Sequence, residues 1–267
     1  MAGLKELWEP LKTEVFRDVL IISEMQPLLV FWVLICMSTV KRPAMTTAIP
    51  QNTIPLYSIG EEIANSVIHG FGTLLAIAGL VLLNLKTRGF LDGQREGKLD
   101  IIAALLFAAT MIGMFLVSTL YHAIQHQGAK RILRKLDHSV IFVFIAGTYS
   151  PICLSGLGGA WGWSLFMVEW SLALLGITLN ILDYKALKKI EVAAYVAMGW
   201  VIVVGFVPLI RSVPVISIVL LLAGGAAYTL GTIWYRMKNV RHTHVIWHVF
   251  VLLGTVCHWF SVWYLNR

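Results

Sequence analysis

The chain has 267 residues, of which 58% are hydrophobic and only 13% are charged, and its formal net charge is +7. Soluble domains carry about 25% charged residues, so this composition, with a mean hydropathy of +0.78, excludes an ordinary soluble domain and indicates a membrane protein. The basic residues lie in short runs between apolar segments, which is typical of membrane-flanking loops and argues against nucleic-acid binding.

Residues 1–56 differ from the rest because they mix charged residues with one apolar run, Pro27–Val40. This run is short for a spanning helix, which needs about 20 apolar residues, and Glu24 prevents its extension upstream. Three interpretations stay open: an interfacial or poorly inserted helix, an additional spanning helix, or a translation start that lies downstream, for example at Met45. We therefore treat 1–56 as an extension and 57–267 as the main domain.

Seven long apolar runs follow, separated by short polar loops. Backbone groups find no hydrogen-bond partners in lipid, and the runs lack the alternation of barrel strands, so each run predicts a spanning helix. The predicted spans are Ile63–Leu85, Ile101–Ala123, Ser139–Leu157, Trp161–Leu182, Val192–Ile210, Val213–Tyr235 and Val245–Leu265. The expected fold is an all-α, seven-transmembrane helix bundle.

The loop charges predict the orientation of this bundle. Ten Lys and Arg residues fall in loops on the side of the segment before the first span, against six on the other side. Cytoplasmic loops carry the excess of basic residues in membrane proteins. The sequence thus predicts a cytoplasmic N-terminus, although the first loop on the outer side is itself basic.

Polar residues at membrane depth are costly and usually functional, and here they occupy the ends of particular helices. Because successive helices alternate in direction, all of these ends meet at one face of the membrane, whichever way the protein is oriented. The residues are Glu62, Asn65 and His69 in the first span, Ser118 and His122 in the second, Asp137 just before the third, and His244 and His248 in the seventh.

The spacing of these residues suggests a metal site. His244 and His248 are four residues apart and can ligate one ion, as in HExxH helices, and His122 supplies a third ligand. Three protein ligands and a water are the pattern of catalytic zinc. The motif HVIWH lacks the glutamate base of metallopeptidases, so Asp137 is the candidate to accept the proton of the water.

Simpler interpretations also remain for these residues. The two histidines of HVIWH could face lipid headgroups, Asp137 could pair with Arg134 or Lys135 in a loop, and Ser118 could bond a carbonyl of its own helix. We interpret the remaining histidines as interfacial or packing residues; these are His126, His138, His242 and His258. His258 lies about 15 Å along the helix from His248, which is too far to join a common metal site. Glu169, within the fourth span, has no assigned role.

The motifs resemble those of the hemolysin III family, the bacterial branch of the progestin and adipoQ receptor (PAQR) family. EIANSVIHG is similar to the first family motif, STLYHA with LDHSVIFVFIAGTYSP to the second, and HVIWHVFVLLGTVCH to the third. The resemblance extends from about Tyr57 to the C-terminus, and residues 1–56 lie outside it.

The resemblance implies a seven-helix bundle with its N-terminus inside a bacterial inner (plasma) membrane. Receptor members of the family hold zinc with three histidines that correspond to His122, His244 and His248, and an aspartate at the position of Asp137 contacts the water on the zinc. The wider superfamily includes alkaline ceramidases, and the bacterial members are linked to hemolysis and to membrane-lipid homeostasis. The implied cofactor is Zn²⁺ and the implied partners are membrane lipids.

Two functional classes follow. In the first, the protein is a zinc-dependent intramembrane hydrolase of a lipid amide or ester, in which Asp137 is the base and Ser118 positions the water or the oxyanion. In the second, the metal is structural, and the protein is a non-enzymatic sensor or modulator of the membrane, or a cytolytic, hemolysin-like protein.

Overall fold

The structure is a computed structural model that describes residues 57–91, 93–237 and 240–265. The regular structure of these residues is helical apart from one isolated bridge between Arg88 and Arg95. The predicted apolar segment Pro27–Val40 and the rest of the extension lie outside the described residues.

Seven helical spans in the described residues are long and apolar enough to cross a membrane, which confirms the predicted all-α, seven-span fold. The spans are α2 (Ile59–Thr87); α3 (Lys98–Ala123); α4 (Gln127–Pro151) with the π-helix η1 (Ile152–Leu157); α5 (Gly159–Ile181); α6 (Lys185–Gly199) with the 3₁₀-helix η2 (Val201–Gly205) and α7 (Phe206–Ser212); α8 (Val215–Arg236); and α9 (Thr243–Trp263). The cytoplasmic position of the N-terminus stays a prediction.

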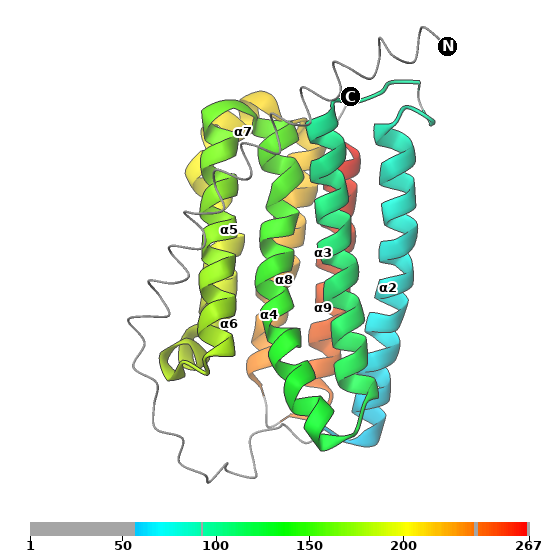
Figure 1. The fold of residues 1–267 in the computed structure, drawn as a ribbon, viewed down its shortest axis with the longest axis vertical. Helices are drawn as coiled ribbons and strands as arrows, with labels where there is room; N and C mark the ends of the chain where they lie inside the picture. The colour runs from blue at the N-terminus through cyan, green and yellow to red at the C-terminus, as the bar shows by residue number, and fades with distance from the viewer. Residues whose placement is uncertain (1–56, 92, 238–239, 266–267) are drawn as a thin grey trace, which may run out of the picture. The chain divides into compact units, whose positions relative to one another are not determined.

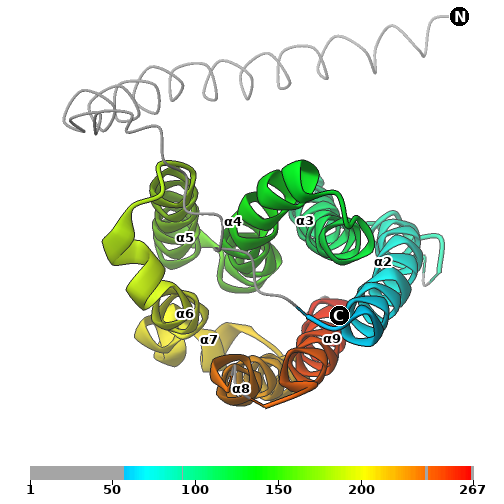
Figure 2. The ribbon, with the colours of Figure 1, turned by 90° about the horizontal axis from the view of Figure 1, so that it is seen from below.

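The spans stand side by side and form a ring when seen from one end, in the order of the chain (Figures 1 and 2). The last helix, α9, closes the ring by packing against both α8 and α2. At one end of the ring lie the starts of α2, α4, α6 and α9 and the ends of α3, α5 and α8. We call it the histidine end, because it carries His122, His244 and His248.

The faces of α2 show how the bundle separates lipid from interior. Glu62, Asn65 and His69 are 5%, 0% and 2% exposed, whereas Ile63 and Val67, on the outward face, are 59% and 64% exposed. The helix therefore turns its polar residues inward and its apolar residues outward, as expected for a helix in lipid. Glu62, Asn65 and His69 thus share the inward face of α2.

The start of α4 differs from the prediction. The apolar run begins at Ser139, but the helix begins at Gln127, so Asp137 and His138 lie inside α4 and not before it. The ring of His126 caps this start by accepting a hydrogen bond from the Ala129 amide at 3.3 Å. Hydropathy marks where a helix enters hydrocarbon, and the charged first turns of α4 precede that point.

The predicted continuous helix Val192–Ile210 is interrupted after Gly199. The hydroxyl of Tyr149, on α4, lies 2.9 Å from the Met198 carbonyl oxygen and 3.0 Å from that of Gly199, and it accepts a hydrogen bond from the Ile202 amide. Backbone groups that are released within a membrane need such partners. The interruption therefore depends on a side chain from another helix, which the local sequence cannot reveal.

Close packing of α3 on α4 depends on Gly147. A Cβ atom at this position would lie 2.0 Å from Thr110 Oγ1 and 2.7 Å from Thr110 Cβ. Because Cβ is fixed to the backbone, the two helices would have to separate to admit it.

We expect Gly147→Ala to lower the free energy of unfolding by about 1–3 kcal/mol, the usual effect of overpacking. Gly113→Ala in α3 is the control, because no atom lies within 4 Å of its added Cβ. Thermal unfolding of the two variants in detergent tests this expectation, and equal midpoints would contradict it.

Candidate metal centre and cavity

Three imidazoles from two helices meet at the histidine end. His122 of α3 and His244 and His248 of α9 each offer a ring nitrogen, and these nitrogens lie within 4.8 Å of one another. His122 and His248 are 0% and 3% exposed, and His244 is partly buried. The structure therefore brings together the three residues that the sequence predicts as metal ligands.

The rings of His122 and His248 face each other through their Nε2 atoms, which are 3.1 Å apart. Two imidazoles on one tetrahedral ion, with metal–nitrogen bonds of about 2.0–2.1 Å, have nitrogens about 3.3 Å apart. The observed separation is close to that value. Each ring turns its other nitrogen, Nδ1, toward α2.

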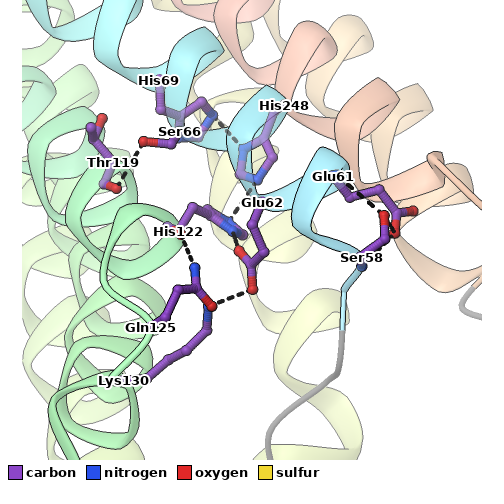
Figure 3. A network of polar contacts seen from close by, with 10 residues as sticks. All are labelled: Ser58, Glu61, Glu62, Ser66, His69, Thr119, His122, Gln125, Lys130 and His248. Atoms are coloured by element: carbon purple, nitrogen blue, oxygen red, sulfur yellow. Dashed lines mark hydrogen bonds and ion pairs between the residues drawn. The ribbon is translucent and has the colours of Figure 1, made fainter. Parts of the chain in front are cut away.

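Glu62 is the α2 partner of His122. One carboxylate oxygen lies 2.6 Å from His122 Nδ1, and the other contacts the ammonium group of Lys130 from α4 (Figure 3). The Lys130 side chain is only 3% exposed. A carboxylate that hydrogen-bonds the distal nitrogen of a ligating histidine is the usual support of a metal site.

His69 is the α2 partner of His248. Its Nε2 contacts His248 Nδ1 (Figure 3), while its own Nδ1 is buried without a hydrogen-bond partner in the described residues. Asn65, between Glu62 and His69 on the same face, is also buried with both side-chain polar atoms unpartnered among those residues. The first predicted motif therefore lies directly behind the candidate ligands.

These contacts determine which nitrogen of His122 is free to bind a cation. With the Glu62 carboxylate as the acceptor of this contact, His122 Nδ1 is the donor and Nε2 is the nitrogen with the lone pair. That lone pair points at the Nε2 of His248, and His244 approaches from one turn away. The donor set thus fits a metal ion that prefers imidazole nitrogen.

Ser118 and Asp137 lie beside these rings and line the same cavity as His244 and His248. Ser118 is 2% exposed, and its hydroxyl bonds no carbonyl of its own helix but lies beside the Asp137 carboxylate. Asp137 is partly exposed and approaches Ser118 and His122. Lys135 pairs with Asp183 and not with Asp137.

The pair of Lys135 with Asp183 also fastens the loop between α5 and α6 to α4. Lys188 contacts the other carboxylate oxygen at 2.7 Å. Burial by itself raises the pKa of Asp183, but hydrogen bonds from the two lysines outweigh this effect and hold the pKa below its ordinary value. The Asp183 carboxylate is therefore a structural partner in the loop.

The cavity has a volume of about 700 Å³ and extends from the histidine end into the bundle. Its inner walls are mostly apolar; they include Ile152, Trp200, Ile202, Leu221 and Val251. A volume of this size is typical of sites that bury a small molecule. The cavity thus extends from the polar residues at the histidine end to apolar walls inside the bundle.

Tyr57 is a site residue that sequence reasoning missed. Its ring stacks on that of His244, with centroids 4.7 Å apart and planes inclined by 19°. Burial raises the pKa of its phenol, which keeps the group neutral. Tyr57 precedes α2 and belongs to no periodic pattern in the sequence. Its contact with His244 therefore becomes visible only in the structure.

Lys130 was also missed, because it looks like an ordinary basic loop residue. Its amine is buried against Glu62 and within 5.2 Å of the Tyr121 ring centroid. No spacing in the sequence distinguishes it from Arg131 or Lys135. Because α4 begins at Gln127, Lys130 lies in its first turn, where it contacts Glu62.

Other histidines have structural contacts outside the metal cluster. His126 caps α4, His138 Nδ1 lies 3.0 Å from a Glu191 oxygen, and the His242 amide donates to Glu61 at 2.7 Å. His258 lines the cavity. Glu169, on α5, is fully buried and neither of its oxygens has a hydrogen-bond partner in the described residues.

The family model described as "Haemolysin-III related" matches residues 57–259 of the chain. The chain belongs to the haemolysin-III family. The match contains every site residue discussed above, and it confirms the resemblance seen in the three sequence motifs.

Curated relatives agree with this assignment. "Hemolysin-3 homolog" of Bacillus subtilis (strain 168) is 39% identical over 207 residues, which cover 78% of this chain and 95% of the relative. "Hemolysin-3" of Bacillus cereus is 36% identical over 205 residues, covering 76% and 91%. "Monocyte to macrophage differentiation factor" of Homo sapiens is 27% identical over 220 residues, covering 78% and 85%. No solved structure matches the chain.

We expect Glu62→Gln to lower the free energy of unfolding by about 3 kcal/mol, because the buried Lys130 ammonium loses its counter-charge. Adding Lys130→Met to this variant removes the uncompensated charge and should restore most of the lost stability. Thermal unfolding in detergent measures both effects.

Lys188→Met is the matched control for this pair of variants. The Lys188 side chain is 54% exposed in its contact with Asp183, and exposed pairs contribute at most about 1 kcal/mol. If Glu62→Gln lowers the free energy of unfolding no more than Lys188→Met does, Glu62 is not the charge partner of Lys130.

Proposed function

We propose that this protein is a zinc-dependent intramembrane hydrolase that cleaves a lipid amide or ester. One observation carries the proposal: three imidazole nitrogens converge at the head of an apolar cavity that Asp137 and Ser118 also line. The apolar walls suit an acyl chain, and the polar head suits the carbonyl group to which that chain is attached.

The ligands that hold the metal in this proposal are His122, His244 and His248. Neutral imidazole suits several transition metals, and three protein ligands are the pattern of catalytic zinc. Zinc supplies a Lewis acid that activates water near neutral pH and polarises a carbonyl. Glu62 and His69 orient two of the rings from behind.

Asp137 is the proposed base. Its carboxylate borders the cavity near His122 and Ser118, so it can take a proton from water and return it to the leaving amine or alcohol. The Ser118 hydroxyl, which lines the cavity beside the Asp137 carboxylate and bonds no carbonyl of its own helix, can hold the water or the developing oxyanion. In this proposal the Asp137 carboxylate transfers protons, and the Ser118 hydroxyl positions the water or the oxyanion.

The site would lie at the cytoplasmic face of a bacterial plasma membrane. This position combines the predicted cytoplasmic N-terminus with the location of the ligands at the end where α2 begins. Substrate would enter sideways from the bilayer, and the reaction would serve membrane-lipid homeostasis.

A second function is favoured by the connections behind the ligands. Contacts of Glu62 with His122 and Lys130, and of His69 with His248, connect α2, α3, α4 and α9. A metal held by His122 and His248 would keep this group of helices together. The protein would then be a non-enzymatic membrane sensor or modulator, or a cytolytic protein, as the name of the Bacillus cereus relative suggests.

We expect about one zinc ion per chain in the detergent-purified protein, and its loss in His244→Ala/His248→Ala. His126→Ala/His242→Ala is the control, because these two histidines occupy the N-cap positions of α4 and α9 at the same end and do not belong to the group whose ring nitrogens converge. Elemental analysis measures the metal. A folded wild-type protein without metal would remove the basis of the hydrolase proposal.

We expect Asp137→Asn to reduce hydrolysis at least about a hundredfold, the usual contribution of a general base, while the metal is retained. Asp183→Asn makes the same chemical change in an exposed loop and should leave the rate unchanged. Mass spectrometry of fatty acids released from a panel of acyl amides and esters in nanodiscs gives the rates. A fully active Asp137→Asn variant, alongside an inactive His248→Ala variant, would favour the structural role of the metal.

A further inference from the structure

His258 is a buried polar side chain at the inner end of the cavity. It belongs to α9, its exposed fraction is 8%, and its ring approaches the backbone of Leu221 on α8, while no side chain of the described residues bonds either ring nitrogen. It nevertheless lines the cavity that begins at His244 and His248. Buried polar groups are almost always hydrogen-bonded, so an exception that faces a cavity indicates a missing partner.

Three hydroxyl-bearing residues that line the cavity with His258, namely Thr148, Tyr228 and Thr229, have their hydroxyls already engaged. Thr148 donates to the Phe144 carbonyl at 2.8 Å, and Thr229 donates to that of Gly225 at 2.7 Å. The hydroxyls of Tyr228 and Thr255 bond to each other at 2.9 Å. The His258 ring therefore has no side-chain partner among the described residues, and its one polar neighbour is the backbone of Leu221.

The packing of α8 makes room for this ring. A Cβ atom at Gly224 would lie 1.8 Å from His258 Cδ2 and 2.3 Å from Nε2, so only glycine admits the imidazole at that position. Tyr228 packs against the ring with its centroid 5.3 Å away. The imidazole is thus held in a fixed place at the cavity wall.

The depth of His258 defines where its partner must lie. Ten residues separate His248 from His258 along α9, a distance of about 15 Å. With C–C bonds of about 1.5 Å, and hence about 1.25 Å of rise per carbon, an extended acyl chain spans this depth in about twelve carbons. A chain whose carbonyl lies at the histidine end would bring its middle carbons to His258.

We propose that the cavity binds acyl chains that carry a hydroxyl group near the middle of the chain, with His258 as the hydrogen-bond partner of that hydroxyl. The inference rests on the proposed function, which places the carbonyl at the histidine end. An unsubstituted chain offers the buried imidazole no hydrogen bond, whereas a hydroxylated chain does. A site that bonds a ligand hydroxyl discriminates against ligands that lack it.

The test is competition binding to the full chain in nanodiscs, with 12-hydroxyoctadecanoate and octadecanoate as the two ligands. We expect the wild-type protein to prefer the hydroxylated chain by about fivefold, the effect of one buried hydrogen bond. His258→Phe should abolish this preference, and His258→Gln, which keeps a hydrogen-bonding group, should retain part of it.

Thr148→Val is the matched control. Thr148 lies eleven residues beyond Asp137, about 16 Å along α4, so it borders the cavity at a depth similar to that of His258. Its hydroxyl is already bonded within its own helix, and the variant should keep the wild-type preference.

Equal affinities in the wild-type protein, or a preference that persists in His258→Phe, would overturn the inference; a water molecule would then be the partner of His258. Binding does not require hydrolysis, so the two proposals fail separately. Hydrolysis without hydroxyl preference removes this inference alone, and preference without hydrolysis removes the proposed enzyme activity alone. Failure of both chains to bind would remove both.

Discussion

A carboxylate that is buried between membrane helices needs positive charge or hydrogen-bond donors beside it, and the histidine end is organised around the carboxylate of Glu62. Lys130 reaches it from α4 and His122 from α3, so one acidic side chain aligns three helices. Because Glu62 engages Nδ1 of His122, the lone pair of that ring points at α9. The geometry of the candidate ligands is therefore a consequence of charge compensation in a medium of low dielectric constant.

The same bundle provides two environments along one cavity. Near the histidine end the lining is polar and includes Asp137 and Ser118, whereas the inner walls are aliphatic and aromatic. This gradient arises because the polar lining residues lie toward the histidine end of the helices, whereas the apolar lining residues lie nearer their middles. A lipid with a polar linkage and an apolar chain has the same gradient, which is why lipid chemistry suits the site better than a soluble metabolite does.

Sequence reasoning predicts the seven spans and the meeting of the three histidines because both follow from local rules: length in hydrocarbon, alternation of direction and helical spacing. It fails where a feature depends on a partner from another helix. Lys130 is indistinguishable from its neighbours until Glu62 is placed beside it, and the break after Gly199 depends on the hydroxyl of Tyr149. Tyr57 stacks on His244 from outside the regular helices. The inner position of His258 is predictable from spacing, but the space that Gly224 leaves for it is not.

The closure of the ring by α9 has a consequence for biosynthesis. His122 and His248 are 126 positions apart in the chain, so at about 5–20 residues per second the ribosome makes the second roughly 6–25 seconds after the first. Throughout that interval α2, α3 and α4 can assemble around Glu62, while the donor set still lacks the two nitrogens that α9 brings. A chain arrested before α9 cannot form the cluster, so any metal bound there is acquired as the last step of assembly and marks a chain whose final helix has reached its place.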